Sequence, residues 1–97
     1  MKLEEGDTRR VLGQVYGALG NQQAAEHELE TGLTVLESLN SQYQVGQTVY
    51  RLAQLHAGTG QEELARQEID RAVVIFARLG AQLDLEPAQA LRDSLGS

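Results

Sequence analysis

The sequence predicts an all-α fold, an αα-hairpin solenoid of two repeats plus a C-terminal capping helix, and three observations lead to this prediction. The chain has 97 residues and one proline, and it is rich in Ala, Leu, Gln, Glu and Arg, which lose little rotamer freedom in a helix. Apolar residues recur at helical spacing, and the runs stop at glycine or asparagine. The chain also matches itself at an offset of forty residues, which is typical of repeat architectures.

The first two predicted helices span residues 4–19 and Gln22–Leu39. The first carries apolar residues at the i, i+3, i+4, i+7 spacing of one helical face, namely Leu12, Val15, Tyr16 and Leu19. The face of the second consists of Ala25, Leu29, Leu33, Leu36 and Leu39. Gly20 and Asn40 follow these runs directly, and both residue types tolerate the left-handed conformation that ends many helices.

Two further helices and a shorter last one follow. Ser41 is the expected N-cap of the third helix, which ends before Gly58–Thr59–Gly60 and has the stripe Val45, Val49, Leu52, Leu55 and His56. The fourth helix begins near Gln61 and is closed by Gly80, and its face consists of Ala65, Ile69, Ala72, Val73, Phe76 and Leu79. Asp84 is expected to cap a last helix over residues 84–95, with Pro87 in the first turn, where its missing N–H does no harm.

The internal match defines the repeat unit. At the offset of forty, Gly6, Thr8, Leu12, Gln14, Gly20, Ala25, Glu28 and Leu39 are identical to Gly46, Thr48, Leu52, Gln54, Gly60, Ala65, Glu68 and Leu79. Small residues recur at Gly13 and Ala53, Ala25 and Ala65, and Gly32 and Ala72, where they let two antiparallel helices approach closely. The sequence therefore predicts a single domain over residues 1–97, with repeat one at 6–39, repeat two at 46–79, and residues 84–95 as a capping helix or the first half of a truncated third unit.

The repeat resembles the tetratricopeptide family, whose signature is W-x2-L-G-x2-Y…A-x3-F…P. The first unit follows it with Leu12-Gly13-x-x-Tyr16-x-x-Leu19-Gly20 and Ala25-x-x-x-Leu29-x-x-Gly32-Leu33, and the second with Leu52-Ala53-x-x-His56, Gly60 and Ala65-x-x-x-Ile69-x-x-Ala72-Val73. The match departs from the signature where Arg9 and Val49 replace Trp and His56 replaces Tyr, and the Pro is missing from both units. The resemblance covers residues 6–79.

Composition excludes several classes of function. The formal net charge is −6 and only eight residues are Lys or Arg, which argues against a nucleic-acid partner. The lack of cysteine excludes disulfides, thiolate metal sites and a cysteine nucleophile. The longest apolar run, Ala72–Ala77, is far shorter than the roughly 20 residues of a membrane span. We expect a cytoplasmic protein with no membrane or nucleic-acid partner.

The titratable residues do not form a recognisable reactive site. His56 falls on the apolar stripe of the third helix, where we expect a packed, half-buried ring with one nitrogen satisfied, and His27 is expected at the surface. The carboxylates show no pair typical of acid–base catalysis, and those of the second helix are interpreted as a solvated face: Glu26, Glu28, Glu30 and Glu37. No phosphate-binding glycine motif occurs. The sequence therefore predicts no catalytic, cofactor-binding or metal-binding residue, and a protein that is not an enzyme.

The resemblance implies a binding groove instead. In tetratricopeptide domains the first helix of each hairpin lines a concave groove that holds an extended peptide or a partner helix. By repeat register this side carries Arg10, Gln14, Gln47, Tyr50, Arg51 and Gln54. Tyr50 lies off the apolar stripe, and Tyr and Arg are typical binding hot spots. The expected function is a non-catalytic protein-interaction module that belongs to a bacterial regulatory or signalling protein. The ratio of seven Arg to one Lys favours the bacterial source.

The alternative is a structural unit that forms a homodimer. About three repeats are normally needed to bury their faces against one another, and this chain has two and a half. The stretch Val73-Val74-Ile75-Phe76 is apolar almost all round, which is typical of a helix buried on every side. Either the last helix covers this surface, or a two-fold contact between the last two helices of two chains does, through Val74, Ile75 and Leu91.

Overall fold

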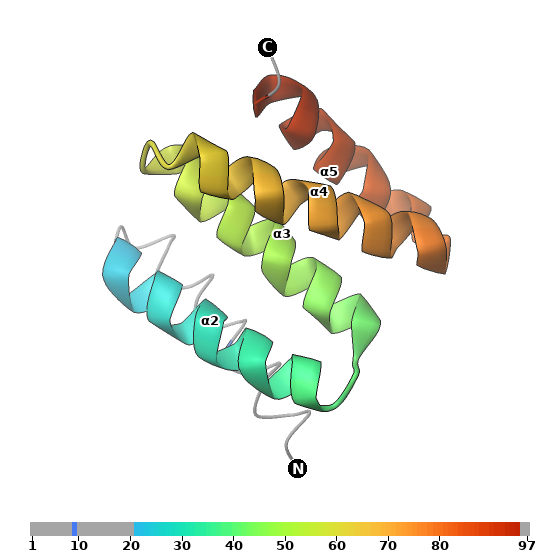
Figure 1. The fold of residues 1–97 in the computed structure, drawn as a ribbon, viewed down its shortest axis with the longest axis horizontal. Helices are drawn as coiled ribbons and strands as arrows, with labels where there is room; N and C mark the ends of the chain where they lie inside the picture. Colours follow the sequence, from blue (N-terminus) through green and yellow to red (C-terminus); the bar gives the residue numbers. More distant parts are fainter. Residues whose placement is uncertain (1–8, 10–20, 96–97) are drawn as a thin grey trace.

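The structure, a computed structural model, describes residue 9 and residues 21–95. Within residues 21–95 the chain forms four helices, α2 (Gln22–Ser38), α3 (Gln42–Gly58), α4 (Glu62–Leu79) and α5 (Gln82–Leu95), and no strand (Figure 1). The prediction of an all-α chain is confirmed for these residues. The predicted helix over 4–19 lies outside the described residues, apart from Arg9, which is helical.

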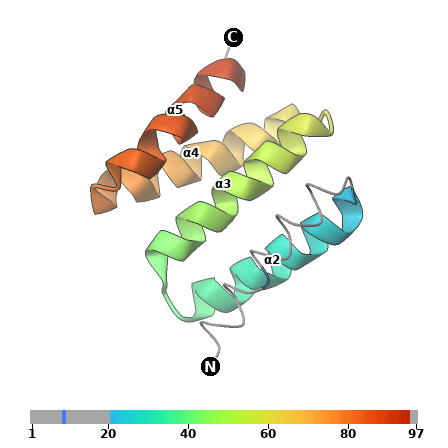
Figure 2. The same cartoon turned by 180° about the vertical axis from the view of Figure 1, so that it is seen from behind.

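The helices pack in chain order, with α3 at the centre. Among the described helices, α2 packs against α3, α3 against α4, and α4 against α5, and α5 also touches α3 (Figures 1 and 2). The contact of α3 with α4 is the most extensive and that of α2 with α3 is smaller. As a result α3 has neighbours on three sides, whereas α2 has one among the described helices.

The turns between helices follow the predicted residues. Asn40 has a φ of 53° and Gly80 a φ of 67°, so both adopt the left-handed conformation expected of them. After Gly80 the backbone N–H of Leu85 donates to the carbonyl of Ala81, so α5 begins at Gln82 and not at the predicted Asp84. Pro87 consequently lies in the second turn of α5, where its missing N–H leaves the carbonyl of Leu83 without a helical donor.

The core lies between α3 and α4 and extends to α2 and α5. Its fully buried residues are Leu36, Val45, Val49, Ala53, Ala65, Ile69, Ala72, Phe76 and Ala88. The predicted small residues at Ala53, Ala65 and Ala72 are buried at 0% exposure, as close helix packing requires. Gly46 marks another close approach, because a Cβ atom there would lie 2.8 Å from Cε1 of Phe76 and 3.0 Å from Cγ2 of Ile75.

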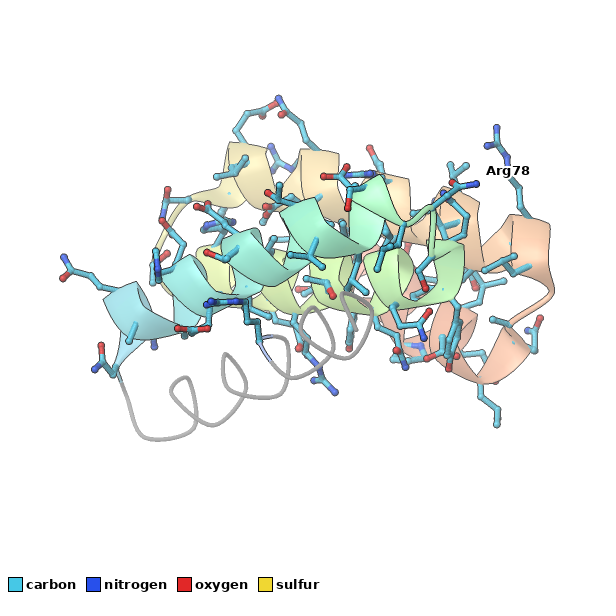
Figure 3. The ribbon with its side chains drawn as sticks, turned by 90° about the horizontal axis from the view of Figure 1, so that it is seen from below. Arg78 is labelled. Atoms are coloured by element: carbon cyan, nitrogen blue, oxygen red, sulfur yellow. The ribbon has the colours of Figure 1, made fainter. Side chains whose placement is uncertain are left out.

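Two residues of the predicted apolar faces are exposed at the surface. Leu39 and Leu79 are 40% and 49% exposed. Both stand at the end of a helix, where Leu39 is the C-cap of α2 and Leu79 the last residue of α4, so the helical spacing that would have turned them inward ends there. Arg78 is also exposed near the end of α4 and points away from the bundle (Figure 3). None of the described helices combines the length and the apolar character needed to cross a membrane.

Candidate functional site

The groove residues predicted on the third helix share one face of α3. Gln47, Tyr50, Arg51 and Gln54 are spaced i, i+3, i+4 and i+7, so they line one side of the helix. Gln47 and Tyr50 are half-buried and Arg51 and Gln54 are exposed, which agrees with the expected partial exposure of the tyrosine ring. The other two predicted groove residues, Arg10 and Gln14, lie outside the described residues.

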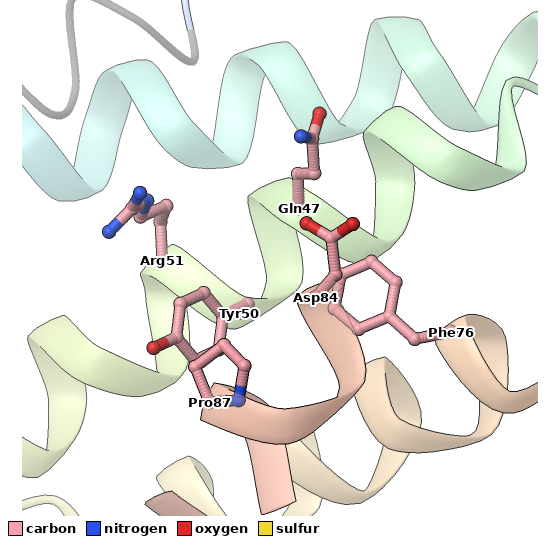
Figure 4. Close-up of a pocket in the computed structure, with 6 residues that line it drawn as sticks. All are labelled: Gln47, Tyr50, Arg51, Phe76, Asp84 and Pro87. Atoms are coloured by element: carbon pink, nitrogen blue, oxygen red, sulfur yellow. The ribbon is translucent and has the colours of Figure 1, made fainter. Parts of the chain in front are cut away.

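Three of these residues line a concave space between α3 and α5, which we call the α3–α5 hollow. Gln47, Tyr50 and Arg51 form its α3 side, Phe76 of α4 its floor, and Asp84 and Pro87 its α5 side (Figure 4). Its volume is about 270 Å³. Ligand pockets for drug-sized molecules span roughly 300–1,000 Å³, so this hollow suits one or two side chains of a larger partner.

Aromatic and polar contacts fix the end of the hollow near α5. The rings of Tyr43 and Phe76 meet edge to face with centroids 6.2 Å apart. The hydroxyl of Tyr43 donates a hydrogen bond of 2.8 Å to Oδ2 of Asp84. Asp84 therefore joins α5 to α3. The sequence-based prediction that it caps α5 is wrong, because α5 begins two residues earlier, at Gln82. Because Phe76 is 1% exposed, the surrounding core holds its ring in place at the base of the hollow.

The opposite end carries a polar network on α3. Nη1 of Arg51 donates to Oε1 of Gln54 at 2.9 Å, and Nε2 of Gln54 donates to the hydroxyl of Tyr50 at 3.1 Å. The guanidinium carbon of Arg51 also lies 5.5 Å from the centre of the Tyr50 ring, within the range of a cation–π contact. Gln54, which does not line the hollow, thus acts on it by orienting two residues that do.

A second cluster, the His56 cluster, joins three helices on another side of α3. Nδ1 of His56 lies 2.6 Å from Oε1 of Glu68 on α4, and Nε2 lies 2.9 Å from Oε2 of Glu26 on α2. His56 is 1% exposed, so it is fully buried and not half-buried, and both of its ring nitrogens are satisfied instead of one. Glu26 is half-buried, which corrects its assignment to a solvated face.

Folding raises the pKa of two groups in this cluster, His56 and Glu68. Burial lowers the pKa of His56, but the hydrogen bonds with Glu68 and Glu26 and the charges of both carboxylates outweigh it, so the pKa lies above the ordinary 6.5. Burial raises the pKa of Glu68 above the ordinary 4.5, and repulsion from Glu30 and Glu26 adds to the rise, although the bond with His56 and its charge lower it. Both groups therefore hold protons more tightly in the folded chain.

The same side chains form the group that comes closest to a metal site among the described residues. One ligand atom each of Glu26, Glu30 and His56 lies within 4.8 Å of the others. Nε2 of His56, the nitrogen that would face a cation there, already bonds Glu26, and Glu30 is exposed. Because the group is satisfied by its own ion pair, we assign no metal to it.

The three residues predicted for self-association have different surroundings. Val74 is 46% exposed on α4, whereas Ile75 is 8% exposed and packs in the core opposite Gly46. Leu91 on α5 is partly buried against the same core. Among these three, only Val74 is available at the surface in the single chain.

Sequence reasoning missed half of the residues that line the α3–α5 hollow and both partners of His56. Phe76, Asp84 and Pro87 were read as core, cap and first-turn residues, and each of them borders the α3–α5 hollow. Glu68 was noted only as a repeat identity with Glu28. The α3–α4 hairpin brings it within reach of His56: His56 stands four residues before Gly60 and Glu68 eight residues after it, so the two lie about one helical turn apart along the antiparallel helices.

Comparison with known proteins identifies no relative: no protein-family model, no curated protein and no solved structure matches the chain.

Proposed function

We propose that the chain is a protein-interaction module that anchors an extended peptide or partner helix in the α3–α5 hollow. One observation carries the proposal: Gln47, Tyr50 and Arg51, expected in a groove from the sequence, border one concave space that also has walls from α4 and α5. The hollow combines an aromatic floor with a cation and an anion at its edges, and pockets of this kind hold the anchor side chains of a partner.

The repeat register supports the same proposal. Helices α2 and α4 begin forty residues apart, and so do α3 and α5. This spacing agrees with the tetratricopeptide resemblance of the sequence, in which the first helices of successive units line the groove. In that reading α3 and α5 are both first helices, and residues 82–95 are the first half of a third unit as well as a cap for α4.

The test starts from selection of a binding peptide. A displayed library of random twelve-residue peptides is selected against the full chain, and the affinity of an enriched peptide is measured by isothermal titration calorimetry. Tyr50→Ala should weaken binding at least about tenfold, as expected for an aromatic hot spot. Tyr50→Phe keeps the ring and should bind nearly as the parent does, and Gln67→Ala, exposed on α4, serves as the control.

If selection enriches no peptide, or if Tyr50→Ala and Gln67→Ala bind the enriched peptide as the parent does, the hollow is not the binding site. Thermal unfolding of each variant separates a loss of affinity from a loss of folding.

Self-association is the second candidate, and exposed apolar side chains favour it. Leu83, at 86% exposure, and Leu79 flank the turn at Gly80, and Val74 is exposed on α4. Exposed apolar groups of this size mark interaction sites when they lie together. Sedimentation equilibrium at micromolar concentration tests this candidate: a dimer that Leu83→Glu or Val74→Glu converts to a monomer supports it, and a monomeric parent rejects it.

A further inference from the structure

The His56 cluster requires one proton more than a neutral histidine and two ionised carboxylates provide. A neutral imidazole donates from one nitrogen only, and an ionised carboxylate can only accept. In the structure a carboxylate oxygen lies within hydrogen-bond distance of each ring nitrogen, at 2.6 Å and 2.9 Å. Both bonds can therefore exist together only if the imidazole is doubly protonated or one carboxyl carries the extra proton.

The surroundings favour the doubly protonated imidazole. Among residue 9 and residues 21–95, the charged groups that face the ring are Glu26 and Glu30 from α2 and Glu68 from α4, and all three are acidic. The side chain of His56 is 2% exposed and that of Glu68 is 17% exposed, so water screens their interaction poorly. A doubly protonated His56 ring is a cation that donates one hydrogen bond to Glu26 and one to Glu68.

The position of the cluster makes α2 the helix that depends on it. Among the described helices, α2 packs against α3 alone, and that contact is smaller than the one between α3 and α4. The bond from His56 to Glu26 fastens α2 to α3, and the bond to Glu68 continues the link to α4. The other link between α2 and α4, from Glu37 to Arg71, joins side chains that are 44% and 45% exposed, and exposed pairs of this kind stabilise little.

We infer that His56 is a proton-operated clamp, which holds α2 against the α3–α4 hairpin while the ring is doubly protonated and loosens α2 when the ring loses a proton. On deprotonation the ring keeps one N–H. Glu68, at 17% side-chain exposure, needs that donor more than Glu26, whose side chain is 40% exposed and can be solvated by water, so the bond from α3 to α2 is the one that is lost. The hairpin of α3 and α4 stays closed, because its apolar core is larger and does not titrate.

Amide hydrogen exchange tests the clamp. Protection factors of α2 and α4 amides are measured by NMR between pH 5.5 and 8.5, with EDTA present, and the imidazole nitrogens of His56 are titrated in the same samples, with exposed His27 as the second histidine. Protection in α2 should fall with rising pH by up to about tenfold per pH unit across the titration of His56, because one proton is released on opening. Protection in α4 should change much less.

Matched variants separate the clamp from general packing. Glu26→Gln keeps the shape of the side chain but removes the need for the second proton, so the pH dependence of α2 protection should disappear. Glu37→Gln removes another α2 carboxylate that pairs with a side chain outside α2, here Arg71 of α4, and should leave the pH dependence in place. Three results would each overturn the inference: equal pH dependence in α2 and α4, an unchanged profile in Glu26→Gln, or a profile that changes when EDTA is omitted.

Discussion

Replacing Gly46 by alanine is the sharpest test of how closely α3 and α4 pack. A Cβ atom at this position would lie 2.8 Å from Cε1 and 3.2 Å from Cζ of Phe76, and 3.0 Å from Cγ2 of Ile75. Contacts under 3.0 Å do not persist, so the Phe76 ring has to move. The ring is held by the core and by the edge contact with Tyr43, but it also borders the α3–α5 hollow, which offers space on one side.

Two opposing effects determine how much Gly46→Ala changes the free energy of unfolding. Alanine in a helix interior is favoured over glycine by about 1 kcal/mol. Overpacking a core costs about 1–3 kcal/mol. Because the nearest atoms belong to a buried ring and not to the end of a flexible side chain, the cost should exceed the gain, and we expect Gly46→Ala to lower the free energy of unfolding by about 1 kcal/mol.

Gly58→Ala is the matched control on the same helix. It meets no atom within 4 Å, so it should gain up to about 1 kcal/mol from helix propensity alone. Urea denaturation followed by circular dichroism measures both variants, and a loss of 1 kcal/mol corresponds to a drop in Tm of about 4–8 °C for a domain of this size. If Gly46→Ala were as stable as Gly58→Ala, the close approach of Gly46 to Phe76 would not constrain the fold.

Three further predictions follow from burial and charge. Folding raises the pKa of His56 and of Glu68, so the stability that these groups contribute is fully present below pH 6.5 and pH 4.5 respectively, and it is lost as the pH rises through each raised pKa. In urea denaturation between pH 6 and 8.5, the free energy of unfolding should fall by at most about 1.4 kcal/mol per pH unit for each proton released. Glu68→Gln should flatten this slope. Leu36→Ala should cost about 2–5 kcal/mol because the residue is 0% exposed, whereas Leu39→Ala should cost less than about 1 kcal/mol at the exposed end of α2; equal losses in thermal unfolding would contradict the assigned core. Pro87→Ala restores the missing helical N–H in the second turn of α5 and should raise Tm, and an unchanged or lower Tm would show that the proline does not strain α5. Because Pro87 lines the α3–α5 hollow, the same variant should bind a ligand of the hollow less tightly.

Helix positions were predictable because they depend on local sequence signals. Asn40, Gly60 and Gly80 all have positive φ, and these residue types tolerate that conformation wherever the chain must turn. The start of α5 was less predictable, because Asp84 is a good N-cap by type but finds a better partner in Tyr43, forty-one residues earlier in the chain. A capping preference of about 1 kcal/mol is easily outweighed by a tertiary contact of this kind.

The candidate sites were predictable only on the helix that carries them. The tetratricopeptide resemblance, applied by repeat register, predicted Gln47, Tyr50 and Arg51 on the groove side of α3, but nothing local to α3 shows which residues of α4 and α5 come to face them. The error at His56 has the same origin, since an apolar stripe indicates burial without indicating what meets the buried ring. A buried histidine needs polar partners for its nitrogens, and this requirement alone would have directed attention to the carboxylates of the neighbouring helices.

The α3–α5 hollow and the His56 cluster use different faces of one helix, and this separation has a consequence for binding. Tyr50 and His56 are six residues apart and so lie about 120° apart around the axis of α3. The walls of the hollow come from α3, α4 and α5, and α2 contributes none of its lining residues. If deprotonation of His56 loosens α2, a peptide that contacts the hollow alone should bind equally well at pH 6 and pH 8. A partner that also contacts α2 would lose part of its contact surface, so its affinity should fall as the pH rises. Calorimetric titration of a short and an extended peptide at both pH values distinguishes the two cases, and a short peptide whose binding weakens at pH 8 would show that the clamp acts through α3 itself.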